Sequence, residues 1–468
     1  MLLALLVLPL LASLGTYVVR DRAARVLAIL VSLVDLGLAV RLAWAGVEPW
    51  RADWIPSLGL SFHLAMDGSN QLLLILAPIL VAAALLVTPP GFHRNSEFCS
   101  LVLLFLGAMQ GLFLSANLGL FYIFYELMLL PAIVLTAGWG GPGGRAAAVK
   151  FFLYTLAGSL AMLLGLLILA FDRGAPNLDF AALQGLDGAV QRTLVLAFAM
   201  AFVVKIPLVP FHGWLPDLYR GAPAQVTALI AGVMSKAGIY GFVKVGLTIF
   251  PEGMESLAPG MLTLALISLL YGVLCALGDP TARGVLAYSS LSHMGMMALG
   301  VFTLNQSGIA GSVLQMFSHG LATGGMFLVL AVMDRRELPS ELERLGGMAR
   351  SMPRLATLGL FLTMASLGLP GLCSFPGEIM ILLGLYAAHP LETALACLGV
   401  VGAGWYMLRL YQGIMHGPPT AAPEDVRPYE SAALLPLVVL CVLVGFFPGV
   451  FVRAAVAWLA AVGVGVTL

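Results

Sequence analysis

Apolar runs of about 18 or more residues follow one another along the whole chain, and each is long enough to cross the roughly 30 Å hydrocarbon core of a bilayer. Of the 468 residues, 60% are hydrophobic and only 10% are charged, whereas a soluble domain carries about a quarter of charged residues. So few charges cannot cover the surface of a soluble protein of this length. The sequence therefore predicts an all-α membrane protein with many spans.

We expect about fourteen transmembrane helices, with four groups at 1–95, 96–250, 256–416 and 430–468. The expected helices are 1–18, 24–45, 69–91, 97–115, 117–140, 146–171, 193–213, 222–248, 258–277, 282–304, 308–333, 355–388, 391–414 and 432–450. The first run has no basic segment before it and no small-residue cleavage site after it, so we interpret it as a retained helix. The stretch 451–468 is apolar but carries Arg453 and is either an interfacial helix or a partial further span.

Arginine is distributed unevenly between alternate connections of this helix set. One side holds thirteen arginines and the other holds five, and cytoplasmic connections are the ones enriched in Lys and Arg. This bias predicts that both termini lie outside the cytoplasm of a bacterial inner membrane. The first side has Arg20, Arg22, Arg25, Arg94, Arg145, Arg220, Arg283, Arg335, Arg336, Arg344, Arg350, Arg354 and Arg427, and the second has Arg41, Arg51, Arg173, Arg192 and Arg453.

The four lysines, unlike most of the arginines, lie in the apolar helices. Lys205 and Lys236 are well inside, Lys244 is near the end of a helix and Lys150 is near the start of one. An ionisable group at mid-bilayer costs at least about 2.5–3.5 kcal/mol, so it persists only where it faces the bundle interior, water or a partner. Because lysine changes its pKa readily on burial whereas arginine stays charged, the two lysines well inside, Lys205 and Lys236, are candidates for proton exchange.

Two expected helices combine an ionisable group with a break. Lys205 opens a segment with Pro207 and Pro210, and Glu378 follows a segment with Pro370 and Pro376. Proline interrupts the helical hydrogen bonds, and the freed carbonyl groups must be satisfied by protein or by water in a cavity. We therefore predict that both breaks line a polar path.

Further ionisable groups lie in four other expected helices. Glu126 is the only carboxylate of the fifth helix, and Lys236 is surrounded by small residues that permit close helix approach. His293 has Ser289 one turn behind it, and His319 has Gln315 and Thr323 one turn away on each side. A static ion pair could explain any single group, but six groups on six helices favour a conducting path for protons or sodium ions.

Other residues receive a structural interpretation. We interpret Asp35 in the second helix as peripheral or paired locally, and the tyrosines and methionines near the ionisable groups as packing residues. The five cysteines lie in apolar segments without CxxC spacing, which argues against metal and disulfide frameworks. The net charge is zero, so nothing suggests binding to nucleic acid.

The two broken helices occupy corresponding positions in two blocks of five helices. Each is the fourth helix of its block, and blocks with an odd number of helices enter the membrane from opposite sides. This arrangement is typical of inverted-topology repeats with sites at the discontinuous helices. We predict two inverted five-helix repeats, each with one discontinuous helix.

Five segments resemble the antiporter-like subunits of respiratory NADH:quinone oxidoreductase (complex I), and among these the subunit M group most closely. They are Phe121–Pro131, Lys150–Ser159, Lys205–Pro216, Leu286–Gly295 and Gly368–Glu378. The resemblance covers nearly the whole chain and implies a fourteen-helix bundle with two inverted repeats. The connections at Asp217–Pro223 and Asp279–Arg283 depart from the common family pattern and leave room for a divergent relative.

The resemblance also implies a proton relay. Its members are a glutamate–lysine pair (Glu126, Lys205), a central lysine (Lys236), connecting histidines (His293, His319) and a terminal glutamate (Glu378). In the expected sequence of events, a proton leaves Lys236 and passes through His293, His319 and water to Glu378. Glutamate at the terminal position favours subunit M, because the L, N and Mrp subunits usually have lysine there.

The resemblance further implies that the chain works inside a complex. The expected partners are L-like and N-like antiporter subunits and lipid. No cofactor is expected in this chain, and NADH, FMN, Fe–S clusters and quinone are expected in partner subunits. The alternatives are an Mrp-type cation/proton antiporter subunit, a membrane subunit of a related hydrogenase complex, and a structural spacer without transport.

Overall fold

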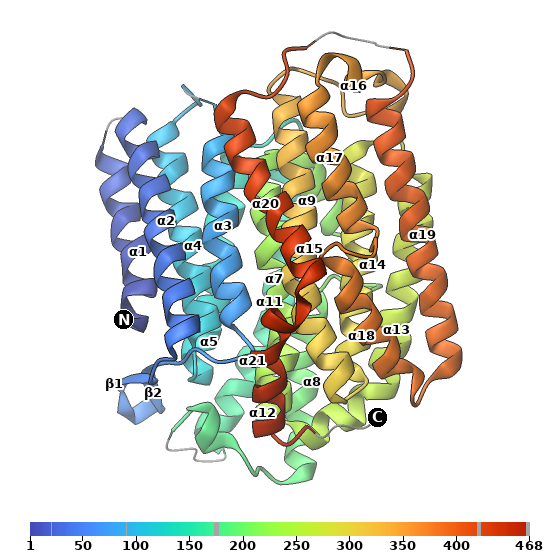
Figure 1. The fold of residues 1–468 in the computed structure, drawn as a ribbon. Coiled ribbons are helices and arrows are strands. Elements are labelled where there is room, and N and C mark those ends of the chain that lie inside the picture. Colours follow the sequence, from blue (N-terminus) through green and yellow to red (C-terminus); the bar gives the residue numbers. More distant parts are fainter. Residues whose placement is uncertain (20, 90, 173–176, 419–422, 465–468) are drawn as a thin grey trace.

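The computed structural model describes residues 1–19, 21–89, 91–172, 177–418 and 423–464. Long helices run side by side, with α1 (Leu2–Val18) at one edge of the bundle and α19 (Pro390–Met415) at the other (Figure 1). Within the described ranges, eleven helical segments are long and apolar enough to cross a membrane, judged by length and composition. The chain is therefore a mostly helical membrane protein, as its apolar runs predict.

The N-terminal part contains a short hairpin that the all-α expectation missed. After α1 come α2 (Asp21–Ala45), β1 (Trp50–Ile55), a 3-10 turn (Pro56–Leu58), β2 (Leu60–Leu64) and α3 (Gln71–Val87). The strands are antiparallel, and Gly59 turns the chain between them with a φ of +67°. Glycine adopts this conformation without steric cost. Trp54 packs on Phe62 across the hairpin, with ring centres 4.9 Å apart.

The middle of the chain contains the first broken helix. The elements are α4 (Asn95–Leu114), α5 (Leu118–Leu127), α6 (Leu129–Trp139), α7 (Gly144–Leu167), a π turn (Ile168–Asp172), a 3-10 turn (Phe180–Leu183), α8 (Gly188–Lys205) and α9 (Leu215–Gly221). Both Pro207 and Pro210 lie in the non-helical segment between α8 and α9. The predicted break after Lys205 is therefore confirmed.

The next span, 224–249, is helical throughout but irregular. It consists of α10 (Ala224–Leu229), a π turn η4 (Ile230–Met234), α11 (Lys236–Gly241), a second π turn η5 (Phe242–Gly246) and α12 (Leu247–Ile249). The span is buried inside the bundle from Ala224 to Leu247. A π turn adds one residue to a helical turn and often occurs at a functional site. The two π turns flank Lys236 and its neighbours.

The second half of the chain is built around α15, which is buried from Gly308 to Met333. Its elements are α13 (Pro251–Gly278), α14 (Ala282–Phe302), α15 (Gln306–Asp334), a 3-10 turn (Leu342–Arg344), α16 (Met348–Ser351), α17 (Pro353–Ser366), α18 (Ser374–Tyr386), α19, α20 (Pro428–Phe446) and α21 (Pro448–Ala461). The second break separates α17 from α18 and contains Pro370. We expect Pro376 in the break from the sequence, but this is wrong, because Pro376 lies in the first turn of α18. Proline fits there because the missing N–H group has no helical acceptor.

Each of the fourteen expected segments coincides with a helix or with an interrupted helix of the structure. Three of them, α1, α3 and the α17/α18 pair, do not reach the length that defines the eleven candidate spans. The number of membrane crossings therefore stays a prediction. Within 451–468, the structure has the end of the separate helix α21, and residues 465–468 lie outside the described residues.

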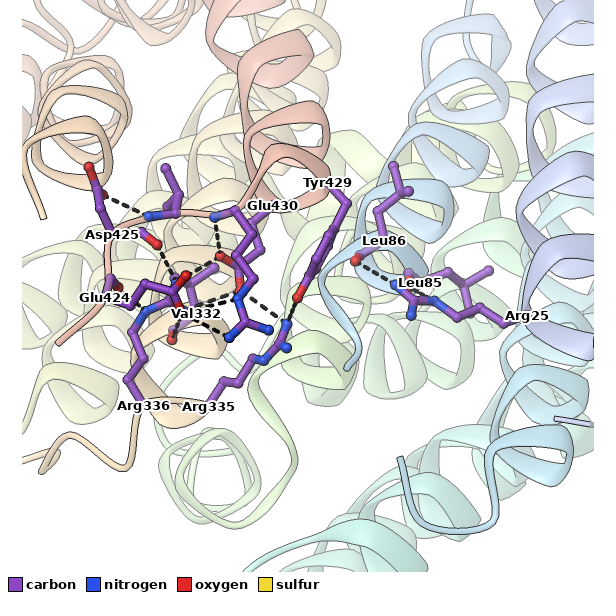
Figure 2. Close-up of polar contacts among 12 residues, drawn as sticks. Arg25, Leu85, Leu86, Val332, Arg335, Arg336, Glu424, Asp425, Tyr429 and Glu430 are labelled. Atoms are coloured by element: carbon purple, nitrogen blue, oxygen red, sulfur yellow. Dashed lines mark hydrogen bonds and ion pairs between the residues drawn. The ribbon is translucent and has the colours of Figure 1, made fainter. Parts of the chain in front are cut away.

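Three arginines assigned to the cytoplasmic side meet at one end of the bundle (Figure 2). Glu430 is fully buried at the start of α20 and accepts hydrogen bonds from Arg335 (3.2 Å) and Arg336 (2.8 Å). The Tyr429 ring lies between Arg335 and Arg25, at 5.3 and 5.9 Å from their guanidinium carbons. This supports the prediction that these three arginines lie on the same side of the membrane. Two further arginines of the prediction, Arg20 and Arg173, lie outside the described residues.

Candidate functional site

Four predicted site residues form one chain of contacts in the buried core. Lys236 Nζ lies 2.7 Å from His319 Nδ1, and the ring centres of His319 and His293 are 5.2 Å apart. His293 Nδ1 lies 3.5 Å from Glu378 Oε1. All four side chains are buried, and they come from α11, α15, α14 and α18. Groups that lose and gain protons are therefore close enough to pass a proton in short steps.

The spatial order of the two histidines differs from the expected one. His319 contacts Lys236 and His293 contacts Glu378, so a path from the lysine to the glutamate meets His319 first. The expectation followed the order of the residues along the chain. Spatial order depends on how α14 and α15 pack, which the sequence alone does not specify.

Lys236 is positioned by the irregular helix that carries it. The π turn before it contains Ala231, whose carbonyl oxygen accepts hydrogen bonds from Lys236 Nζ (2.5 Å) and Ser235 Oγ (3.0 Å). Gly238 allows close packing of this helix on α8, because a Cβ atom there would lie 2.6 Å from the Phe202 carbonyl oxygen. The small residues around Lys236 thus permit the predicted close approach.

His319 uses both of its ring nitrogens. Its Nδ1 faces Lys236, and its Nε2 lies 3.1 Å from Thr323 Oγ1, one helical turn further along α15. When the Lys236 ammonium group donates to Nδ1, the neutral ring carries its hydrogen on Nε2, facing the threonine hydroxyl. Thr323, from the polar stripe predicted on this helix, therefore orients the histidine ring, which lies between the lysine donor and the threonine hydroxyl group.

Glu378 lies in α18 just after the second break. Gln315 Nε2 donates to its Oε1 at 3.2 Å, and His293 approaches the same oxygen. Gly368, in the break, has a φ of +79°, and a Cβ atom there would overlap Glu378 Oε2. The discontinuous helix thus makes room for a carboxyl group inside the bundle, which explains why the ionisable group and the Gly/Pro-rich break occur together.

Lys205 and Glu126 do not form the expected ion pair. In the described part of the chain, no carboxylate oxygen lies within 4.0 Å of Lys205 Nζ. The ammonium group instead lies 5.0 Å from the centre of the Tyr125 ring and 5.7 Å from that of Phe151. Tyr125 faces Lys205, and Glu126, the next residue, points about 100° further around the helix. A cation–π contact therefore replaces the direct pair.

The chain matches the model of one protein family over residues 115–403. That family is described as NADH:quinone oxidoreductase/Mrp antiporter, TM. Subunit M of the NADH-quinone oxidoreductase of Rickettsia felis is 35% identical to it over 409 residues, which covers 85% of this chain and 82% of that subunit. The chain belongs to the NADH:quinone oxidoreductase/Mrp antiporter family. The resemblance to subunit M is thereby confirmed.

Two solved structures have the same fold. A chain of respiratory complex I from Thermus thermophilus superposes with a TM-score of 0.93 at 32% identity, covering 99% of both chains. A chain of the Mrp complex from Dietzia sp. gives a TM-score of 0.87 at 22% identity, covering 98% of this chain and 97% of that one, which shows a common fold. The antiporter-family fold therefore extends over essentially the whole chain.

For this member of the antiporter family, sequence reasoning found the ionisable groups but missed parts of their surroundings. Tyr125 had been interpreted as packing, although it lies directly beneath the Lys205 ammonium group. The π turns around Lys236 have no proline or other marker in the sequence. The position of Tyr125 next to the only carboxylate of its helix was the one available signal for its role.

Proposed function

We propose that this chain is the proton-translocating membrane subunit of a respiratory NADH:quinone oxidoreductase. The observation that carries the proposal is the continuous contact chain Lys236–His319–His293–Glu378 in the buried core. Subunit M of Rickettsia felis and the complex I chain of Thermus thermophilus support the parent complex. Buried groups in such a chain of contacts are retained for transport rather than for stability, because each is costly in a membrane.

Proton transfer along the chain follows from the donor and acceptor atoms. The Lys236 ammonium group gives a proton to His319 Nδ1, which leaves a neutral lysine and an imidazolium. The imidazolium passes a proton to His293, directly or through one water, because the rings are 5.2 Å apart. His293 Nδ1 then protonates the Glu378 carboxylate, from which the proton leaves to the outer side.

Lys205 and Glu126 would set the charge at the start of this relay. Lys205 ends α8 immediately before the break, and its ammonium group is stabilised by aromatic rings rather than by a carboxylate. A change in charge near Glu126 would then act on Lys205 through space. The positive charge of Lys205 would in turn repel the proton on Lys236 and so promote its release. The energy would come from redox chemistry with NADH, FMN, Fe–S clusters and quinone in partner subunits, with L-like and N-like subunits as neighbours.

We further propose that the chain crosses the membrane fourteen times, with both termini outside the cytoplasm. The eleven candidate spans, together with α1, α3 and the α17/α18 pair, supply fourteen segments. The breaks at Pro207 and Pro370 occur in the fourth helix of each five-helix block, which supports inverted repeats in 96–250 and 256–416. Accessibility of single introduced cysteines to a membrane-impermeant reagent would test the orientation.

The test of the proposed function is Lys236→Ala in the intact complex in sealed vesicles. Proton uptake per electron is measured together with NADH oxidation. Removal of a proton-transferring group slows its step roughly 100-fold or more, so the yield should fall while the complex still assembles. Lys150→Ala is the matched control, because Lys150 is half-exposed and paired with Asp217. A normal proton yield from an assembled Lys236→Ala complex would contradict the proposal.

The family description and the Mrp-like fold support a second candidate, a cation/proton antiporter subunit. This candidate predicts sodium-stimulated transport in vesicles that contain no dehydrogenase. Glu378 argues against it, because lysine is the usual residue there in Mrp subunits. A structural spacer would instead show altered assembly in Lys205→Ala and Glu378→Gln without a change in protons per electron.

A further inference from the structure

Two glutamines in the membrane interior hold carboxyl groups in the same way. Gln110 Nε2 donates to Asp35 Oδ2 at 2.6 Å, and Gln315 Nε2 donates to Glu378 Oε1 at 3.2 Å. All four side chains are buried. In both pairs the glutamine Oε1 atom is also buried and has no hydrogen-bond donor, and Asp35 Oδ1 has none either.

Among the residues that the structure describes, the helices packed around Asp35 provide no positive charge. The helix α2 packs against α1, α3 and α4. Neither α1 nor α3 carries a charged side chain, and the charged residue of α4 is Glu97, in its first turn. On α2 itself, the next basic residues are Arg25 and Arg41, more than one helical turn away from Asp35 in each direction. An ionised carboxylate at this place would lack a counter-charge in the most costly environment for one.

A single proton satisfies the unpartnered atoms of such a pair. A carboxylic acid has one O–H donor in addition to its accepting oxygen. When the acid O–H of Asp35 donates to Gln110 Oε1 and Gln110 Nε2 donates back to Oδ2, both buried oxygens gain a partner. The second hydrogen of the Gln110 amide is already used, since Nε2 also donates to the Leu74 carbonyl group at 3.1 Å. The amide orientation is thereby fixed.

We propose that Gln110 and Gln315 hold Asp35 and Glu378 as protonated acids, and that only Glu378 exchanges its proton. The difference lies in the next neighbour. His293 Nδ1 lies 3.5 Å from Glu378 Oε1, whereas Asp35 has no titratable partner within ion-pair distance among the described residues. We call Asp35, in the N-terminal helices, the closed site, because no neighbouring titratable group among the described residues exchanges its proton. We call Glu378 the open site, because His293 can exchange its proton.

The exchange at Glu378 conserves charge and atoms. In the relay step the N–H bond at His293 Nδ1 breaks and an O–H bond forms at Glu378, so that an imidazolium facing a carboxylate becomes a neutral ring facing an acid, and the acid is the state that Gln315 holds until its proton leaves to the outer side. Gln315 serves both states, because its Nε2–H group donates to the carboxylate and its Oε1 accepts from the acid. Gly377 keeps space for this amide, since a Cβ atom there would lie 2.8 Å from Gln315 Oε1. Gln315 is thus a positioning residue of the relay, and this part of the proposal rests on the proposed function.

Infrared spectroscopy of the intact complex in lipid nanodiscs tests the protonation states. A protonated carboxyl group has a carbonyl stretching band that an ionised carboxylate lacks, and the band shifts in D2O if the proton exchanges. We expect Asp35→Asn and Glu378→Gln each to remove one such band, with D2O shifting the Glu378 band first. Spectra in which either substitution removes no carboxyl band would overturn the proposal for that residue.

Proton yield per electron tests the positioning role with a matched pair of variants. Gln315→Met should change the ratio of protonated to ionised Glu378 about fivefold, which corresponds to the loss of one hydrogen bond of about 1 kcal/mol. It should also lower the proton yield per electron. Gln110→Met removes the same group from the closed site, so the yield should stay at the wild-type value. Asp35→Asn, which keeps the shape and one hydrogen bond of the pair, gives the same readout if Gln110→Met fails to assemble.

Two outcomes would overturn the positioning role. The first is an unchanged Glu378 band and an unchanged yield in Gln315→Met, and the second is an equal loss of yield in Asp35→Asn. Failure of the proposed function is distinguishable, because a normal yield in Lys236→Ala would reject the relay while the infrared bands still report whether the two carboxyl groups carry protons.

Discussion

Lys205 shows how a buried ammonium group is stabilised without a paired carboxylate. Its Nζ atom lies over the Tyr125 ring at 5.0 Å from the ring centre, and Glu126 lies on another side of the same helix. A desolvated cation–π contact contributes up to about 2 kcal/mol. A cation held by a ring carries no fixed counter-charge, so a change of charge elsewhere in the complex acts on it more readily than on a tight ion pair.

A double-mutant cycle decides which neighbour stabilises Lys205. We expect Tyr125→Leu and Lys205→Met to show a coupling free energy of about 1–2 kcal/mol. Glu126→Gln with Lys205→Met should show a smaller coupling, because the two groups do not touch. The measurement is the free energy of unfolding of each variant in a denaturant titration. A larger coupling for the Glu126 cycle would show that the expected ion pair exists.

The sequence predicts which residues form the site better than it predicts their contacts. Lysine, histidine and glutamate in apolar helices stand out because each is costly there, and all six predicted residues belong to helices around the core. The partner of Lys205 could not be predicted, because neighbouring residues on a helix point in different directions. The order of His319 and His293 depends on packing between helices, for which one sequence holds no direct signal.

At the scale of the element, the hairpin β1–β2 is anchored by one loop residue between α7 and α8. Asp179 accepts hydrogen bonds from Ser61 (2.6 Å), Asn117 (2.9 Å) and Arg51 (2.9 Å). Burial raises the pKa of Asp179, but the hydrogen bonds from these three residues and from Asn177 more than offset it and bring the pKa down to about 2. The carboxylate form therefore joins the hairpin to the start of α5.

This anchor predicts a pH dependence of the hairpin. The pKa of Asp179 is lower in the folded state than the value of about 3.9 in an unfolded chain, so its stabilisation is complete above about pH 4 and is lost as the pH falls toward 2. A spin label at Ser57→Cys should become mobile over that interval. Adding Asp179→Asn should make the label mobile already at pH 7 and remove the dependence. A label whose mobility is the same in both proteins at pH 7 would contradict this role.

Irregular elements differ in how well the sequence predicts them. Proline indicated both helix breaks, because it removes a backbone donor and crowds the preceding turn. Pro376 was assigned to the break although it lies in the first turn of α18, because a proline is equally compatible with both places. The π turns around Lys236 and the hairpin at 50–64 were missed, since neither has a distinctive residue pattern in so apolar a chain.

At the scale of the whole molecule, the cluster in Figure 2 joins helices from both ends of the chain. Arg25 of α2 donates to the carbonyl oxygens of Leu85 (3.0 Å) and Leu86 (2.8 Å) at the end of α3. Its guanidinium group packs on Tyr429, which also hydrogen-bonds Arg335. The N-terminal helices are thereby held against α20 and against the end of α15, the helix that carries His319.

Glu430 is the residue on which this junction depends. It is fully buried and balances the charges of Arg335 and Arg336, so its removal leaves two arginines facing each other without a counter-charge. Removing one partner of a buried ion pair costs about 3–5 kcal/mol, and we expect Glu430→Ala to lower the free energy of unfolding by that amount in a denaturant titration. Glu424→Ala is the matched control, because Glu424 pairs with Arg427 at the exposed surface, where ion pairs contribute little. Equal effects of the two substitutions would mean that the buried cluster is not what holds the two ends of the chain together.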